Sequence, residues 1–526
     1  MMRRCLLVLL AFSTLTAYAD VGAGKRWWSY VQYLASDKLE GRGVGTEGER
    51  LAAHFVADHF KQLGLTPAGT QGYLQPVKFY SCTVEEKESS LALVREGKSE
   101  SLRLGEDAIL RAAVPPAPSL RAPLAFVGFG LSVPELKYDD LAGQDLHGKV
   151  VVFIAGGPSS IPGALRAHAQ SAGERWHWLH RAGAIGLISI YNPHHMDIPW
   201  TRAMVLRFLP TLRLADPAMD EMPGDQLGIG FNPAAAEKLF VGSGHTFAEL
   251  VEAAERGEQL PRFPLAVSLE EHAKYVQKEV TSDNIVGIRP GSDPALKSEY
   301  VIVSAHVDHL GIGEPINGDR IYNGAMDNAS GVATVLDVAD ALQESGAKTR
   351  RSLLFLVVTG EEAGLLGSRY YAEYPTVPIP KIVGDVNVDM FLPILPLKKL
   401  NTYGLEESSL GPLLKKVAAE DGVETLPDPA PERNVFIRSD QYSFIKKGIP
   451  SIFFSVGYSK GTPEEATFKQ WLTNRYHSPS DDILQPVDLA AAAEYDKIVM
   501  RLTEAIANDD HHPQWNPHSF FRRYAK

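Results

Sequence analysis

Cysteine is nearly absent from this sequence of 526 residues, which contains only Cys5 and Cys82. Cys5 belongs to an N-terminal stretch, residues 1–19, with a basic start, a short apolar middle and small residues at its end, the pattern of a cleavable secretory signal peptide. Cleavage would deliver the chain to the periplasm or the exterior and leave Cys82 alone, so no intrachain disulfide could form. The mature fold must therefore be held by its core or by bound metal.

Positive charge and long apolar runs are also scarce. Lys and Arg together number 52 against 64 Asp and Glu, and the formal net charge of -12 argues against general nucleic-acid binding, which uses basic surfaces. Beyond the signal, no apolar segment reaches the ~20 residues that span a bilayer, so we expect no integral membrane segment. The apolar content of 44% is that of an ordinary globular protein, and the length predicts at least two domains.

The second half of the chain shows an alternation of strands and helices. Short, continuously apolar segments alternate with amphipathic helical patterns, as in a sheet that is covered by helices on both faces. We predict an α/β fold with a mixed-to-parallel central sheet, and strands at 286–288, 300–305, 352–359, 382–388 and 451–456.

Residues 118–270 differ from the second half of the chain in their pattern of predicted strands and helices. Strands are predicted at 124–127, 150–154 and 185–190, with a helix around Trp176 and Leu179 between the last two. The block contains no set of residues that suggests catalysis. We therefore treat it as a part of the chain distinct from the second half.

Five positions at the ends of the predicted strands or in turns of the second half carry side chains that suit metal binding. In an α/β sheet the carboxyl ends of neighbouring strands converge, whereas ordinary surface charges do not. The candidates are His306, Asp327, one of the adjacent pair Glu361-Glu362, Asp389 and His477.

Each candidate also has an ordinary structural explanation. Asp327 could cap the helix that follows it, the two glutamates could lie in a solvated loop, and His477 could be a turn residue before Ser-Pro. The joint placement of all five at one sheet edge is what favours a functional site.

The chemistry of the set fits two metal ions. Imidazole and carboxylate ligands without thiolate suit Zn²⁺, with Mn²⁺ or Co²⁺ as substitutes. Five side chains can hold two ions only if one carboxylate bridges them, which leaves positions for water and substrate. Asp308 is placed to accept the second N–H of His306, and a glutamate beside a ligand glutamate can serve as the general base for a metal-bound water.

These motifs together resemble a known family. The set consists of His306-Val307-Asp308, residues 326–331 (Met-Asp-Asn-Ala-Ser-Gly), residues 360–364 (Gly-Glu-Glu-Ala-Gly), Val388-Asp389-Met390 and Tyr476-His477. It is similar to the di-zinc exopeptidases of peptidase family twenty-eight, the bacterial leucyl aminopeptidase type. The resemblance covers roughly residues 275–505, with a further segment at 25–80.

The resemblance implies the zinc exopeptidase fold and two bound zinc ions. It implies that His306 and Asp389 hold one ion, that Glu362 and His477 hold the other, and that Asp327 bridges them. It also implies a cis peptide bond after Asp327.

For the remaining residues, the resemblance implies that Glu361 is general base and then acid toward a metal-bridged water, and that Asp308 orients His306. Ser439, Asp440 and Tyr442 fall where the family has residues near the substrate pocket.

The middle block, with its Gly148-Lys149 turn and the Tyr138-Asp139-Asp140 loop, resembles a protease-associated domain. We therefore expect the catalytic domain to be split into residues 20–117 and 271–526, with the protease-associated insertion at 118–270.

The predicted function is hydrolysis of N-terminal residues from peptide substrates with a free N-terminus. A carboxypeptidase of the same fold is an alternative, since Arg433, Arg438 and Arg475 could bind a C-terminal carboxylate. A glutaminyl cyclase-like aminoacyl transfer is a second alternative, although five ligands favour two metals and hydrolysis. A binding module without enzymatic activity would be expected only if ligands were missing.

Overall fold

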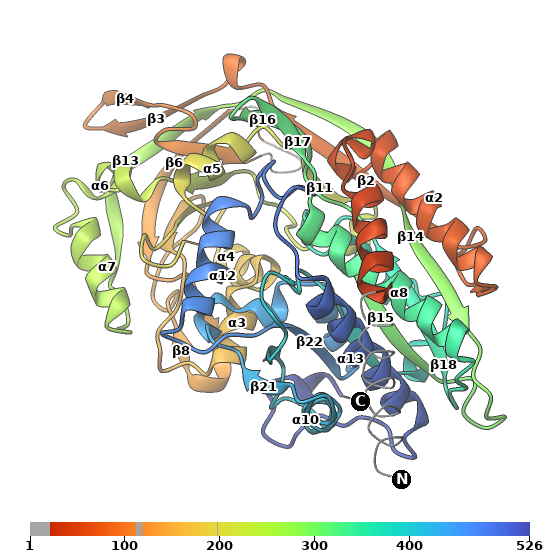
Figure 1. Ribbon diagram of the computed structural model, residues 1–526. Helices are drawn as coiled ribbons and strands as arrows, with labels where there is room; N and C mark the ends of the chain where they lie inside the picture. The colour runs from red at the N-terminus through yellow and green to blue at the C-terminus, as the bar shows by residue number, and fades with distance from the viewer. Residues whose placement is uncertain (1–21, 112–116, 118, 197, 526) are drawn as a thin grey trace, which may run out of the picture. The chain divides into compact units, whose positions relative to one another are not determined.

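The computed structural model describes residues 22–525 except 112–116, 118 and 197, so the predicted signal peptide lies outside the described residues. The chain forms two compact units (Figure 1). Unit 1 comprises the chain up to Val77, Thr281–Ala430 and Val435–Lys526, and unit 2 comprises Lys78–Val280 and Pro431–Asn434. Within the described ranges, every helix is too short or too polar to cross a bilayer.

Four parallel strands form the centre of unit 1. Their order in the sheet is β18 (Ser352–Val358), β15 (Tyr300–His306), β19 (Ile382–Asn387) and β22 (Ser451–Val456). The sheet continues on both sides. Strand β14 (Tyr275–Arg289) is antiparallel to β18, and β2 (Leu74–Val84) lies beyond it. Strand β20 (Lys399–Tyr403) is antiparallel to β22, and β21 (Glu424–Pro427) pairs with β20 in parallel. The predicted mixed-to-parallel α/β sheet is thus confirmed.

The central strands are buried on both faces, as their continuous apolar sequences predict. Side chains alternate between the two sides of a strand, and here alternate residues belong to different core clusters. Val301 and Val303 of β15 pack in the larger cluster, whereas Ile302 packs in the smaller one. All three are fully buried. The sheet therefore separates two apolar layers, each of which helices must cover.

Helices cover these layers (Figure 1). The larger cluster includes side chains of α2 (Glu47–Gln62), α8 (Ser330–Ser345) and α13 (Leu489–Asn508), together with the helical residues 22–34. The smaller cluster includes side chains of α9 (Leu366–Glu373) and α11 (Gln441–Ile445). Two further helices of unit 1 are α10 (Leu410–Glu420) and α12 (Pro463–Asn474).

Unit 2 contains its own eight-stranded sheet. The strand order is β4 (Lys98–Leu102), β3 (Ser90–Arg95), β13 (Arg262–His272), β6 (Ser119–Val127), β9 (Val150–Ile154), β10 (Gly186–Ile190), β12 (Gly228–Phe231) and β5 (Ala108–Arg111). Its helices are α3 (Gly163–Gln170), α4 (Ala172–Arg181), α5 (Trp200–Leu206), α6 (Glu237–Phe240) and α7 (Phe247–Glu255).

The limits of unit 2 are wider than the predicted insertion at 118–270. Strand β3 pairs with β13 through register partners such as Leu93 and Leu269, so residues before 118 belong to the same sheet. The unit boundaries fall inside the long strands β2 and β14. The identity of the insertion as a protease-associated domain stays a prediction.

The buried Asp140 accounts for the Tyr-Asp-Asp motif of unit 2. Its carboxylate accepts backbone N–H groups of Phe129 and Leu131, both at 3.2 Å, and the hydroxyl of Tyr138 at 2.6 Å. The motif therefore closes a loop of the unit and needs no catalytic explanation.

Candidate metal centre

The carboxyl ends of three adjacent parallel strands present the candidate ligands. His306 is the last residue of β15, Glu361 and Glu362 follow the end of β18, and Asp389 follows the end of β19. Because these strands are neighbours in the sheet, the side chains at their ends lie close together.

Asp327 reaches the same place from a π-helical turn, Ala325–Ala329, which precedes α8. The Asp327-Asn328 peptide bond is cis, as the sequence resemblance implies. The buried carboxylate of Asp481 holds this turn, because it accepts the backbone N–H groups of Met326 at 3.0 Å and Asp327 at 3.1 Å. The position of Asp327 is therefore fixed through its own backbone.

The carboxylate of Asp327 lies between two histidines. Its Oδ1 is 3.5 Å from Nε2 of His306, and its Oδ2 is 3.2 Å from Nε2 of His477. His306 Nε2 is also 3.4 Å from Asp389, and His477 Nε2 is 3.1 Å from Oε2 of Glu362. Each oxygen of Asp327 thus faces a different group of ligands, which is the placement that a bridging carboxylate requires.

The donors fit zinc. Two groups of three residues each have ligand atoms within 4.8 Å of one another, namely His306, Glu361 and Asp389, and His309, Asp327 and Glu362. Nε2 of His477 is buried and has no hydrogen-bond partner within the described part of the chain, although two carboxylates lie beside it. A buried ring nitrogen without a hydrogen bond amid carboxylates is suited to a cation, and imidazole with carboxylate oxygen is a usual zinc donor set.

The two adjacent glutamates differ in electrostatic environment. Burial raises the pKa of Glu361 well above its usual value, and the carboxylates of Asp389 and Asp440 add to that effect. Burial would also raise the pKa of Glu362, but His477 and His309 hold it well below its usual value. Neighbours in the sequence thus have pKa values that move in opposite directions.

Asp308 contacts His306 differently from the prediction. The sequence predicts that its carboxylate accepts an N–H of His306, but Nδ1 of His306 lies 3.1 Å from the Asp308 backbone carbonyl, whereas the nearest carboxylate oxygen is 3.8 Å away. The carboxylate instead accepts the backbone N–H groups of Glu361 at 3.1 Å and Glu362 at 3.3 Å. The reason is geometric, because the bend after β18 directs both N–H groups at this side chain.

The three residues predicted near a substrate pocket are buried. Ser439, Asp440 and Tyr442 are 2%, 0% and 4% exposed, respectively. Ser439 accepts a hydrogen bond from the side-chain amide of Asn387 at 2.9 Å, and burial raises the pKa of Asp440 to about 7. Contact of these side chains with a substrate stays a prediction.

Three residues that support the centre were not assigned from the sequence: Arg42, His309 and Asp481. Asp481 holds the Asp327 turn, and His309 contacts Glu362 at 2.6 Å. His309 lies within the conspicuous His-Val-Asp-His sequence, which was the available signal. No pattern in the sequence pairs Asp481 with the backbone of Asp327, which lies 154 positions earlier. Nor does any pattern pair Arg42 with the carbonyl of Val307, which lies 265 positions later.

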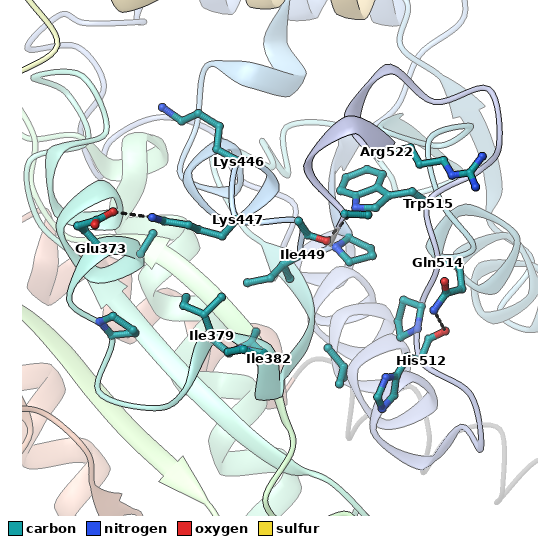
Figure 2. A pocket seen from close by; sticks show the side chains of 18 residues that line it. Glu373, Ile379, Ile382, Lys446, Lys447, Ile449, His512, Gln514, Trp515 and Arg522 are labelled. Atoms are coloured by element: carbon teal, nitrogen blue, oxygen red, sulfur yellow. Dashed lines mark hydrogen bonds and ion pairs between the residues drawn. The ribbon is translucent and has the colours of Figure 1, made fainter. Parts of the chain in front are cut away.

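Unit 1 contains a cavity whose lining side chains are shown in Figure 2, near the amino-terminal ends of two central strands. It has a volume of about 820 Å³ and includes Ile382, the first residue of β19, and Ile449, which precedes β22. None of the candidate ligands lines it. The metal centre and this cavity are therefore separate features.

Residues 284–503 match the profile of Peptidase family M28. The chain is 28% identical over 231 residues to leupeptin-inactivating enzyme 1 of Streptomyces exfoliatus, a match that covers 43% of this chain and 48% of that protein. It is 28% identical over 244 residues to a probable leucine aminopeptidase 2 of Aspergillus oryzae, with coverage of 44% and 46%. The chain thus spans about half the length of the curated relatives that it matches.

Among solved structures, an aminopeptidase from Aneurinibacillus sp. strain AM-1 has a similar fold. The TM-score is 0.58 at 19% sequence identity, and the match covers 94% of this chain and 97% of that chain. At this level of identity the likeness shows a shared fold.

Proposed function

We propose that the protein is a zinc-dependent aminopeptidase, which removes residues from the free amino terminus of peptides; the match of residues 284–503 to Peptidase family M28 supports this proposal. The observation that carries the proposal is the placement of Asp327 between His306 and His477 in a centre formed at three strand ends. Relatives that are named aminopeptidases support the choice of reaction.

In the proposed centre, His306 and Asp389 would hold one ion, Glu362 and His477 would hold a second, and Asp327 would serve both. Bound zinc would polarise the scissile carbonyl and lower the pKa of a water molecule to ~7. The low pKa of Glu362 supports its role as a ligand, since a ligand carboxylate must stay ionised.

Glu361 is the proposed general base and acid. Its carboxylate accepts a proton from the attacking water and donates it to the leaving amine. A raised pKa supports this role, because a carboxylate must hold the proton for a time before it passes it on. Asp308 contributes by fixing the backbone of the Glu361-Glu362 bend. This would hold Glu362 at the ligand position and Glu361 at the position of the general base.

A carboxypeptidase would need a cation to bind the substrate's terminal carboxylate. Arg475, one of three arginines considered for that role, already donates a hydrogen bond to the Ser480 carbonyl and lies 4.0 Å from the carboxylate of Asp482. Because Arg475 is engaged within the chain and a relative is named a probable leucine aminopeptidase, we favour the aminopeptidase. The signal peptide predicted at residues 1–19 would place the enzyme in the periplasm or outside the cell.

The test compares two kinds of substrate on the full chain loaded with zinc. Aminoacyl chromogenic substrates with a free amine should be hydrolysed, and peptides with a blocked amino terminus should not. A chelator should abolish the activity, and added zinc should restore it. Release of C-terminal residues from blocked peptides, with no turnover of free-amine substrates, would overturn the aminopeptidase in favour of the carboxypeptidase.

A further inference from the structure

His309 contacts the proposed metal centre, but it is not one of the five proposed ligands. Its side chain is fully buried, and its Nδ1 is 2.6 Å from Oε1 of Glu362. The other oxygen of Glu362, Oε2, faces Nε2 of His477 at 3.1 Å. The two oxygens of one carboxylate are thus divided between two histidines.

The contact between Glu362 and His309 has the geometry of a hydrogen bond, whereas the contact between Glu362 and His477 does not. An ionised carboxylate can only accept, so Nδ1 of His309 must carry the proton of this bond. A protonated ring nitrogen has no lone pair to offer a metal. Nδ1 of His309 is therefore placed as a donor to the ligand and not as a ligand itself.

The backbone around His309 holds its ring in place. The N–H of His309 donates to the carbonyl of Arg42 at 3.1 Å. The buried guanidinium of Arg42 in turn donates to the carbonyls of Val307 at 2.8 Å, Asn323 at 2.7 Å and Gly324 at 3.0 Å. One arginine thus joins the segment that carries His309 to the segment that leads to Asp327.

Gly324 provides the space for the ring. Its φ is +61°, and a Cβ at this position would lie 2.5 Å from Cγ of His309. No side chain larger than hydrogen fits there without moving the ring. The ring therefore packs directly against the backbone of Gly324 and not against a flexible side chain.

We propose that His309 is a positioning residue that donates its Nδ1–H to Oε1 of Glu362 and thereby leaves Oε2 as the single oxygen that binds the second metal ion. The proposal rests on the proposed metal centre. Hydrogen bonds to ligand carboxylates fix their orientation, and loss of such a partner typically weakens metal binding ~10–100-fold.

The test measures zinc affinity of the full chain by titration against a chromogenic chelator, independently of turnover. Asparagine places an amide nitrogen near the position of histidine Nδ1, so His309→Asn keeps a donor. His309→Leu fills similar space without a donor, and His511→Ala, at a side chain that is 91% exposed, serves as the control. The absorption spectrum of the Co²⁺-loaded protein reports the geometry of the ligands.

The proposal predicts two bound ions with wild-type affinities for His309→Asn and His511→Ala. For His309→Leu, it predicts a second ion bound ~10–100-fold more weakly and an altered Co²⁺ spectrum. Unchanged affinity in His309→Leu would overturn the proposal and leave only a packing role. Loss of the second ion in His309→Asn would instead make His309 a ligand and also overturn it. Failure of the wild-type chain to bind zinc would refute the proposed function itself.

Discussion

The carboxylate of Asp308 accepts a hydrogen bond of 3.1 Å from the backbone N–H of Glu361. Its second oxygen accepts the N–H of Glu362 at 3.3 Å, so one side chain fixes the backbone of both adjacent glutamates. Burial raises the pKa of Asp308 to about 6. This side chain links β15 to the bend after β18. The bend carries both Glu361, the proposed general base, and Glu362, the proposed metal ligand.

The first prediction concerns Asp308→Asn. Asparagine has one acceptor oxygen and an NH₂ group, so one of the two backbone N–H groups would face a donor instead of an acceptor. We expect kcat/KM for aminoacyl substrates to fall ~10–100-fold. Asp319→Asn is the control, because Asp319 is exposed and accepts only a local hydrogen bond from Ile321. Wild-type kinetics in Asp308→Asn would show that the bend does not depend on this carboxylate.

The second prediction concerns Gly367 in α9. A Cβ at this position would lie 2.0 Å from the carbonyl oxygen of Thr359, just before the two glutamates. Gly367→Ala must therefore displace α9 or the bend, and we expect a loss of ~1–3 kcal/mol in unfolding free energy together with reduced turnover. The measurement is chemical denaturation alongside a kinetic assay.

The matched control is Gly163→Ala at the start of α3, where a Cβ would meet no atom within 4 Å. That change should be neutral or stabilise by up to ~1 kcal/mol. Equal stability of the two alanine variants would contradict the close packing of α9 against Thr359.

The third prediction is a pH dependence of stability that arises in unit 2. Burial raises the pKa of Asp225 from its ordinary 3.8 to about 7, while its Oδ1 accepts the N–H of Leu227 at 3.2 Å. Between these two pKa values the folded chain holds a proton that the unfolded chain has lost. The folded state is therefore favoured at low pH, and this contribution is lost as the pH rises from about 4 through about 7.

Asp225→Asn keeps the acceptor for Leu227 and removes the titration. We expect its advantage over the wild type in unfolding free energy to grow by roughly 2–4 kcal/mol between pH 4 and pH 8, since each pKa unit is worth ~1.4 kcal/mol. Denaturant titrations of both proteins at several pH values measure the difference. A difference that does not change with pH would mean that Asp225 is ionised freely in the folded chain.

Much of unit 1 could be predicted because its signals are local. Continuous apolar runs defined the central strands, and the same runs placed His306, the two glutamates and Asp389 at strand ends. The spacing of residues does not show which glutamate binds metal. Only the resemblance to a family assigns metal binding to Glu362 and proton transfer to Glu361. In the structure, burial and the carboxylate of Asp389 raise the pKa of Glu361, whereas His477 and His309 lower the pKa of Glu362.

The features that were not predicted depend on contacts between distant parts of the chain. The Asp308 carboxylate turns toward the N–H groups of a bend some fifty residues later, and nothing in the local sequence indicates that choice. The start of unit 2 at Lys78 differs from the predicted start of the insertion, and it lies inside a single long strand, β2. Pairing of β3 with β13 decides that boundary, and strand pairing cannot be deduced from composition.

The central claim, that Glu361 transfers protons while Glu362 binds metal, is tested most directly by one paired measurement of zinc content and turnover. Both substitutions to glutamine keep size and remove the charge of one glutamate. Glu361→Gln should retain two zinc ions and lose turnover by a factor of ~10²–10⁴, whereas Glu362→Gln should lose zinc from the second position. The reverse pattern, with zinc lost in Glu361→Gln and retained in Glu362→Gln, would contradict the account.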